Sequence, residues 1–177
     1  TWGWSQQDWA SDGHFPGDGT TVRYDEGFSM GYRGFDRDGI DPAFCFGHGL
    51  SFAEFQWREP RVDRYAITAA ELDGGKTVSV GVTIENASDR TGVEVVQCYL
   101  SPTSGDAVDA TRPPQWLVGF ESVELTPGES RDVTIDLGHV AFRRWLSRWS
   151  IPSGEWEVRL SASSREHRFT LPLQTLP

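Results

Sequence analysis

The chain has 177 residues, of which 37% are hydrophobic and 12% aromatic, enough for one domain with an extension or for two small units. Its formal net charge is −10, because 26 Asp and Glu outnumber 16 Lys and Arg. Nucleic acids and anionic membranes attract basic surfaces, so this balance argues against both as partners. No apolar run approaches the roughly 20 residues that a membrane-spanning helix needs.

The first residues, TWGWSQQDWASDGHFPGDG, contain neither the basic region nor the apolar stretch of a signal peptide. The chain starts with Thr1 instead of Met, and we therefore expect that it begins inside a longer gene product. The sequence leaves the localisation open between secreted and cytoplasmic.

The two cysteines, Cys45 and Cys98, are too few and too far apart for a disulfide framework or a zinc site. We expect each to behave as a small buried hydrophobe and the two not to be bonded to each other.

Residues 1–50 are rich in glycine and aromatic residues and show no sustained helical or strand period. A segment of this length without its own elements is unusual inside a compact domain, so we expect it to lie against a neighbouring surface. The aromatic side chains that would make this contact are Trp2, Trp4, Trp9, Phe15, Tyr24, Phe28, Tyr32, Phe35, Phe44 and Phe46.

From residue 51 onward the chain alternates apolar and polar residues with the period of half-buried strands. Turn residues such as Pro127 and Gly128 separate these runs. The predicted strands are 76–86, 92–100, 115–125, 131–137, 154–163 and 167–173, with 92–100 apolar on both faces and therefore central. The predicted core contains Val80, Val82, Ile84, Val96, Ile135, Val158 and Leu160. The pattern predicts a mainly β, antiparallel β-sandwich with a long irregular N-terminal extension, and only 139–149 suggests a short helical turn.

Three aspartates, Asp36, Asp38 and Asp41, first suggest calcium. An EF-hand loop that starts at Asp36 would need Gly at its sixth position and Glu at its twelfth, but these are Asp41 and Gly47. We therefore interpret the run as a solvated turn and expect no metal and no cofactor.

The histidines also fail the tests for catalysis and metal binding. His48 lies in a Gly-His-Gly stretch near Cys45, but the chain has no G-x-S-x-G elbow and no complete dinucleotide fingerprint. We interpret His48 as a hydrogen-bonded structural residue. The others, His14, His139 and His167, have no ligand spacing.

Glycoside hydrolysis needs two carboxylates about 5–10 Å apart, so each acidic residue is a candidate. Glu26 is plausible in a cleft because it sits in a Tyr-Asp-Glu-Gly turn. The remaining candidates fall on polar strand faces or in turns, where we expect solvated carboxylates. These are Glu94, Glu121, Glu124, Glu129 and Glu157. No complete acid/base pair is predicted.

Eight tryptophans are many for this length, and exposed aromatic platforms are one way to bind sugars. Trp116 and Trp156 fall in strand patterns and are predicted core residues. The pattern does not place Trp2, Trp4 and Trp9.

Five segments, in order along the chain, resemble the C-terminal part of glycoside hydrolase family 3 enzymes, the β-glucosidase and β-xylosidase group. They are YDEGFSMGYRGFD (24–36), PAFCFGHGLSFAEF (42–55), TGVEVVQCYL (91–100), LVGFESVELTPGES (117–130) and SGEWEVRLSASSRE (153–166). Cys45 stands where the family usually has Pro, and Phe52 where it usually has Tyr; both are tolerable apolar exchanges.

The resemblance implies that residues 1–50 are the tail of an α/β sandwich domain with its linker, and that 51–177 form a fibronectin type III-like domain. It implies an accessory part of a β-glucosidase-like hydrolase of terminal β-glycosidic bonds, with both catalytic carboxylates in the preceding domains. The Ser-Asp-Gly at 11–13 does not match the family's nucleophile motif. We therefore expect no catalytic residue here, an inactive isolated chain, and the missing catalytic domains as partner, which would bring the carbohydrate substrate.

Two other functions remain open at this stage. A stand-alone carbohydrate-binding module would show coplanar exposed aromatic rings on one sandwich face. A protein-interaction domain of immunoglobulin type would show an apolar patch on one sheet. Fold alone does not choose among them, and homo-oligomerisation stays open as well.

Overall fold

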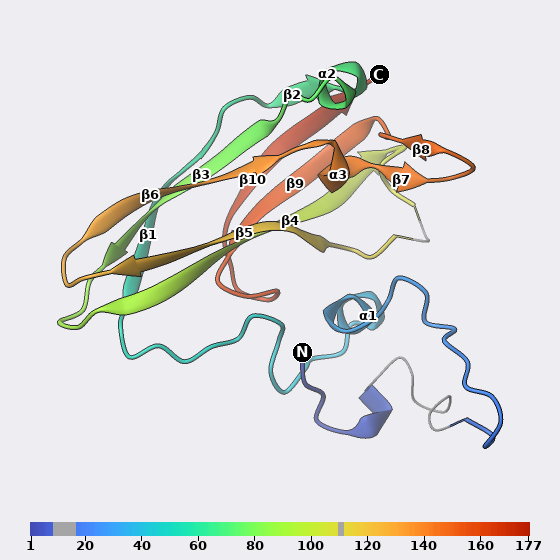
Figure 1. Ribbon diagram of the computed structural model, residues 1–177, viewed down its shortest axis with the longest axis horizontal. Coiled ribbons are helices and arrows are strands. Elements are labelled where there is room, and N and C mark those ends of the chain that lie inside the picture. Colours follow the sequence, from blue (N-terminus) through green and yellow to red (C-terminus); the bar gives the residue numbers. More distant parts are fainter. Residues whose placement is uncertain (9–16, 110–111) are drawn as a thin grey trace.

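The computed structural model describes residues 1–8, 17–109 and 112–177. Figure 1 shows a sandwich of two sheets, with the blue and cyan N-terminal segment running along its lower side. The predictions for Trp9, His14, Phe15 and the Ser-Asp-Gly at 11–13 lie outside the described residues.

The smaller sheet has the antiparallel order β1-β3-β6. Its strands are β1 (Phe55–Val62), β3 (Val78–Asn86) and β6 (Ser130–Leu137). Val82 of β3 lies opposite Val133 of β6, and both side chains point into the core. The sheet therefore buries one face and leaves the alternate polar residues in solvent.

The larger sheet has the order β2-β10-β9-β4-β5 and is antiparallel except that β2 pairs in parallel with β10. Its strands are β2 (Ala66–Thr68), β10 (His167–Leu176), β9 (Gly154–Ser161), β4 (Gly92–Gly105) and β5 (Trp116–Leu125). The prediction of a central strand at 92–100 is confirmed, because β4 lies between β9 and β5. A turn with Gly128 at φ 73° leads from β5 to β6 in the other sheet.

The core fills the space between the two sheets, and the antiparallel sandwich prediction is confirmed. All seven predicted core residues are buried, and Trp156 is 1% exposed with its Nε1 donating to Thr175 Oγ1 at 2.9 Å. Trp116 is only partly buried and meets Trp156 edge-on.

The structure has more short helices than the single helical turn that the sequence predicts. The predicted turn at 139–149 contains α3 (His139–Phe142), followed by a hairpin of β7 (Arg144–Trp145) and β8 (Trp149–Ser150). The sequence pattern did not predict α2 (Ala69–Asp73), whose first turn is fixed by a capping box. In this box Thr68 and Glu71 bond each other reciprocally. Hydrogen bonds from Lys76 and Thr68 lower the pKa of Glu71 to about 2.

The N-terminal segment is irregular over most of its described length, as predicted, but it also contains two short helices that the sequence did not predict. It contains the 3-10 turn η1 (Gln6–Asp8) and the helix α1 (Tyr32–Asp38), which ends at Gly39 with φ 64°. The main chains of Trp2 and Phe44 also form an antiparallel bridge. None of the helices that the structure describes is long and apolar enough to cross a membrane.

Both cysteines are free, in agreement with the prediction. Cys98 is buried in β4, and this burial raises the pKa of its thiol to about 12. Cys45 is half-buried and donates to Ser163 Oγ at 3.3 Å.

Val82→Asp should unfold the chain, because an unpaired carboxylate in the core costs several kcal/mol. Val82 is fully buried, whereas Val93 on β4 is 51% exposed and serves as the matched control. We expect thermal unfolding to show loss of the cooperative transition for Val82→Asp and a nearly unchanged transition for Val93→Asp. A wild-type melting temperature for Val82→Asp would contradict the assigned core.

Candidate functional site

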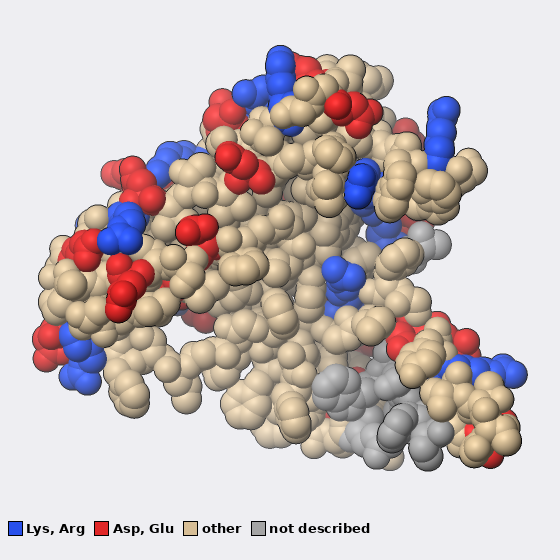
Figure 2. Space-filling view, viewed as in Figure 1, with Lys and Arg blue, Asp and Glu red and all other residues tan. Residues whose placement is uncertain are grey.

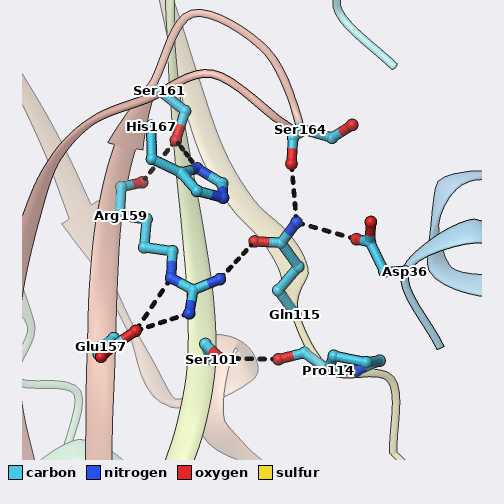
Figure 3. A network of polar contacts seen from close by, with 9 residues as sticks. All are labelled: Asp36, Ser101, Pro114, Gln115, Glu157, Arg159, Ser161, Ser164 and His167. Atoms are coloured by element: carbon cyan, nitrogen blue, oxygen red, sulfur yellow. Dashed lines mark hydrogen bonds and ion pairs between the residues drawn. The ribbon is translucent and has the colours of Figure 1, made fainter. Parts of the chain in front are cut away.

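The contact between the N-terminal segment and the sandwich is the most elaborate polar site in the described part of the chain. Asp36 on α1 accepts a hydrogen bond from Gln115 Nε2 at 2.8 Å and pairs with Arg165 Nε at 2.8 Å. Arg165 lies between β9 and β10, and its Nη2 also donates to the carbonyl of Ile40. Figure 3 shows the carboxylate of Asp36 pointing from its helix toward the Gln115 amide.

Gln115 also connects the N-terminal segment to the larger sheet by hydrogen bonds. Its Oε1 accepts from Arg159 Nη1 at 3.0 Å, and its Nε2 also donates to the Ser164 carbonyl at 2.8 Å. Arg159 in turn binds Glu157 through two nitrogens (Figure 3). Gln115 is 3% exposed, so its amide is fully committed to these three partners and fixes the position of α1 on the sandwich.

An aromatic contact lies beside this network. The Tyr32 ring stacks on Phe46 at 5.3 Å and meets the buried Tyr99 edge-on at 5.8 Å. The Tyr32 hydroxyl accepts the backbone N–H of Leu117 at 2.8 Å. Tyr32 is partly buried, so this ring packs against the sandwich of the same chain.

Gly47 shows how closely the segment approaches the sheet. It has φ 80°, and a Cβ at this position would collide with the amide of Gln97 on β4. That amide is held by Tyr99, which donates to its oxygen, and by the Ala162 carbonyl, which accepts from its nitrogen. Only glycine fits here without displacing the buried amide.

The outward side of the segment remains largely apolar. In Figure 2 the lower edge, where the chain runs between α1 and β1, carries few charged atoms. The exposed large hydrophobic residues from the described residues of this part of the chain are Trp2, Trp4, Val22, Tyr24, Phe28, Met30, Phe44, Phe46, Leu50 and Phe52. A group of exposed apolar side chains of this kind is typical of a surface that binds another protein, a ligand or a membrane.

The aspartates form no cation site. The prediction of a solvated turn at 36–41 is wrong for Asp36, whose side chain is 8% exposed and paired with Arg165. Asp38 pairs with its neighbour Arg37, and Asp41 is exposed. Throughout the described ranges, no three His, Cys, Asp or Glu side chains gather as a metal site requires.

The candidate acids are scattered. Glu26 lies half-buried in a turn, and its Oε2 is buried with no hydrogen-bond partner among the described residues. Glu94 is half-buried, and desolvation raises its pKa, so the prediction of a simply solvated carboxylate fails there. Glu157 and Glu129 are ion-paired with Arg159 and Arg131.

The structure places two of the histidines. The His48 ring is exposed and lies 5.3 Å from the Phe44 ring, and its structural hydrogen-bonding role stays a prediction. The ring of His167, which has no metal-ligand spacing in the sequence, shares a hydrogen bond with Ser161 Oγ at 2.8 Å. Partial desolvation and then the charge of Arg159 lower the pKa of His167.

Comparison with known proteins agrees with this architecture. Residues 94–164 match the fibronectin type III-like domain family. The chain is 35% identical to thermostable beta-glucosidase B of Acetivibrio thermocellus over 156 residues. This alignment covers 86% of this chain and 20% of that protein. The chain is 36% identical, again over 86% of its length and 19% of the relative, to an exo-alpha-(1->6)-L-arabinopyranosidase of Bifidobacterium breve.

Among solved structures, the GH3 beta-glucosidase of Bifidobacterium adolescentis matches 100% of this chain and 26% of its own, with a TM-score of 0.86 and 32% identity. The chain matches the C-terminal region of family 3 glycoside hydrolases. It spans about a fifth of the length of the curated relatives, so the region corresponds to their accessory fibronectin type III-like end.

Asp36→Asn should release the N-terminal segment of this family 3 region. Asn keeps the shape and the bond to Gln115 but removes the charge that Arg165 neutralises, which weakens the contact by about 2 kcal/mol. Asp38→Asn is the matched control, because Asp38 is on the same helix and pairs with its neighbour. We expect limited proteolysis to cut residues 40–54 several times faster in Asp36→Asn, with the sandwich intact. Equal cleavage of the two variants would contradict the role of Asp36.

Proposed function

We propose that the chain is the C-terminal accessory part of a β-glucosidase-type enzyme and stabilises the catalytic domains that precede it. In this proposal residues 1–50 are the end of an α/β sandwich domain with its linker, and residues 51–177 are the fibronectin type III-like domain. The matching relatives are larger enzymes of which this region is one portion, which supports such a link.

The observation that carries the proposal is the two-sided character of the N-terminal segment. Its inner side is anchored by Asp36 and Tyr32, while its outer side exposes Trp4, Phe28 and Phe44. Burying one such aromatic side chain contributes about 1.5–3 kcal/mol. A segment that is anchored on its inner side and carries several such side chains on its outer side offers the preceding domains an apolar surface.

The substrate class follows from the relatives. Several are named as β-glucosidases and others as arabinopyranosidases, so the proposed enzyme acts on a terminal glycosidic bond, with a β-glucoside as the first substrate to try. No acid/base pair is assigned to this chain. The proposed roles of nucleophile and acid belong to the missing domains.

The geometry does not favour a stand-alone sugar-binding module. A module of that type would show coplanar exposed aromatic rings on one sandwich face, but the exposed pair Trp145 and Trp149 meets edge-on at 70°. The exposed aromatic residues gather instead on the N-terminal segment.

Phe44→Ser tests the proposed interface when it is made both in this chain and in the longer native gene product. Phe44 is 56% exposed, so the variant should melt nearly like wild type in the 177-residue chain. In the longer product the same change should cost about 2 kcal/mol, because the ring is covered there. Calorimetry of the four proteins measures the difference.

Phe120→Ser provides the control, because Phe120 is 64% exposed on β5, outside the segment. It should have little effect in either length of chain. Equal behaviour of Phe44→Ser and Phe120→Ser in the longer product would overturn the proposed interface.

A further inference from the structure

A hollow lies between the N-terminal segment and the β7–β8 hairpin, close to the Asp36 network, since Arg33 of α1 and Trp116, which follows Gln115, both line it. Its volume is about 440 Å³, within the range of small-molecule sites. Figure 2 shows this side of the molecule hollowed, with basic atoms along the concave edge. The lining residues that matter most are Arg33, Arg112, Arg143, Arg144, Trp145 and Trp149.

The charge around this hollow is opposite to that of the chain. Among the described residues, four arginines and one acidic residue, Asp109, line it, although the chain as a whole carries −10. Arg144 Nη1 pairs with Asp109 at 3.4 Å, and Arg112 Nη2 donates to the carbonyl oxygens of Phe142 and Arg143. The hollow is therefore a local positive site on an acidic protein.

The guanidinium groups are incompletely compensated. Arg33 Nε, Arg112 Nη1 and Arg144 Nε are buried without a hydrogen-bond partner among the described residues. Burial, and then the neighbouring Arg144, lower the pKa of Arg112 to about 10. Both observations mean that desolvation of positive charge is costly here, and an anion in the hollow would offset that cost.

Aromatic rings lie against two of the guanidinium groups and line the opening of the hollow. Arg112 lies 4.4 Å from the centre of the Trp116 ring, and Arg143 lies 4.4 Å from that of Trp149. Trp145 and Trp149 are both more than half exposed and present flat apolar surface at the opening. Stacked guanidiniums are preorganised to accept a planar anion, since less side-chain freedom is lost on binding.

We propose that this hollow binds a small organic anion, a carboxylate carried on a ring. The carboxylate would lie near Arg112 and Arg144, and the ring would contact Trp145 or Trp149. Carboxylates suit this arrangement because arginine binds them with paired, charge-assisted hydrogen bonds. The ring can be a pyranose, as in a uronate, or an arene, as in an aryl acid. The accessory function assigns no ligand to this hollow, but the two proposals share Phe28, which lines the hollow and also belongs to the exposed surface of the N-terminal segment.

Titration of the 177-residue chain tests the proposal, with tryptophan fluorescence and amide NMR shifts as readouts. The probes are methyl β-D-glucuronoside and benzoate, which separate the two ring types. Methyl β-D-glucoside is the neutral control, differing from the first probe at the carboxylate. We expect at least one carboxylate to bind with a Kd of about 1 mM or tighter, more weakly as salt is added, and the neutral glycoside to leave the hollow unperturbed.

Variants localise the binding. Arg112→Lys keeps the charge but removes the planar fork, and Arg143→Gln removes a charge at the rim; each should weaken binding about tenfold. Arg148→Gln is the matched control, because Arg148 is exposed in the same hairpin and does not line the hollow. If Arg112→Lys does not fold, Arg143→Gln still decides. The proposal is overturned if neither carboxylate binds up to about 50 mM, if the neutral glycoside binds equally, or if Arg148→Gln weakens binding as much as Arg143→Gln.

Discussion

A carboxylate that has been removed from water must keep its cationic partner, and this constraint decides how the two parts of the chain fit together. Asp36 is 8% exposed, and it meets Arg165 and the buried Gln115. Asp36 is in α1, Arg165 lies between β9 and β10, and Gln115 directly precedes β5. Loss of any one of them would leave a buried polar group without a partner, so the network favours a single position for α1.

Once α1 is fixed, Tyr32 and Gly47 also lie against the sandwich. Tyr32 is held between Phe46 and Tyr99, and Gly47 touches the amide of Gln97. The outward side then carries its aromatic residues as a fixed surface. A surface that is already ordered loses less conformational entropy when a partner covers it. This is the physical reason that a segment without much secondary structure can serve as an interface.

The sequence predicted well the features that depend on local alternation. Residues 76–86 became β3 and residues 92–100 became the central strand, because burial of one or both faces imposes a period that can be read directly. Strand β1 was missed because Pro60 and a bulge with Glu59 at φ 54° interrupt its pattern, which an edge strand tolerates. Helix α1 was not predicted because it has only 7 residues, with Gly31 before it, Gly34 within it and Gly39 after it.

The site was harder to predict than the fold, since its partners are far apart along the chain. Asp36 reads as a turn residue until Arg165 and Gln115 are brought to it by the sandwich. The arginines that line the hollow beside the β7–β8 hairpin are also brought together from distant parts of the chain. The resemblance in five ordered segments correctly identified the family 3 C-terminal region, because recurring motifs record packing that a single pattern does not reveal.

The central claim is that this region supports catalysis carried out elsewhere, and hydrolysis of an aryl β-glucoside tests it most directly. A retaining or inverting glycosidase needs two suitably spaced carboxylates, and none are assigned here. We predict no turnover by the purified 177-residue chain and measurable turnover by a longer protein in which the proposed catalytic domains precede it. Turnover by the 177-residue chain alone, abolished by Glu26→Gln, would contradict the account and place the catalytic acid in the Glu26 turn.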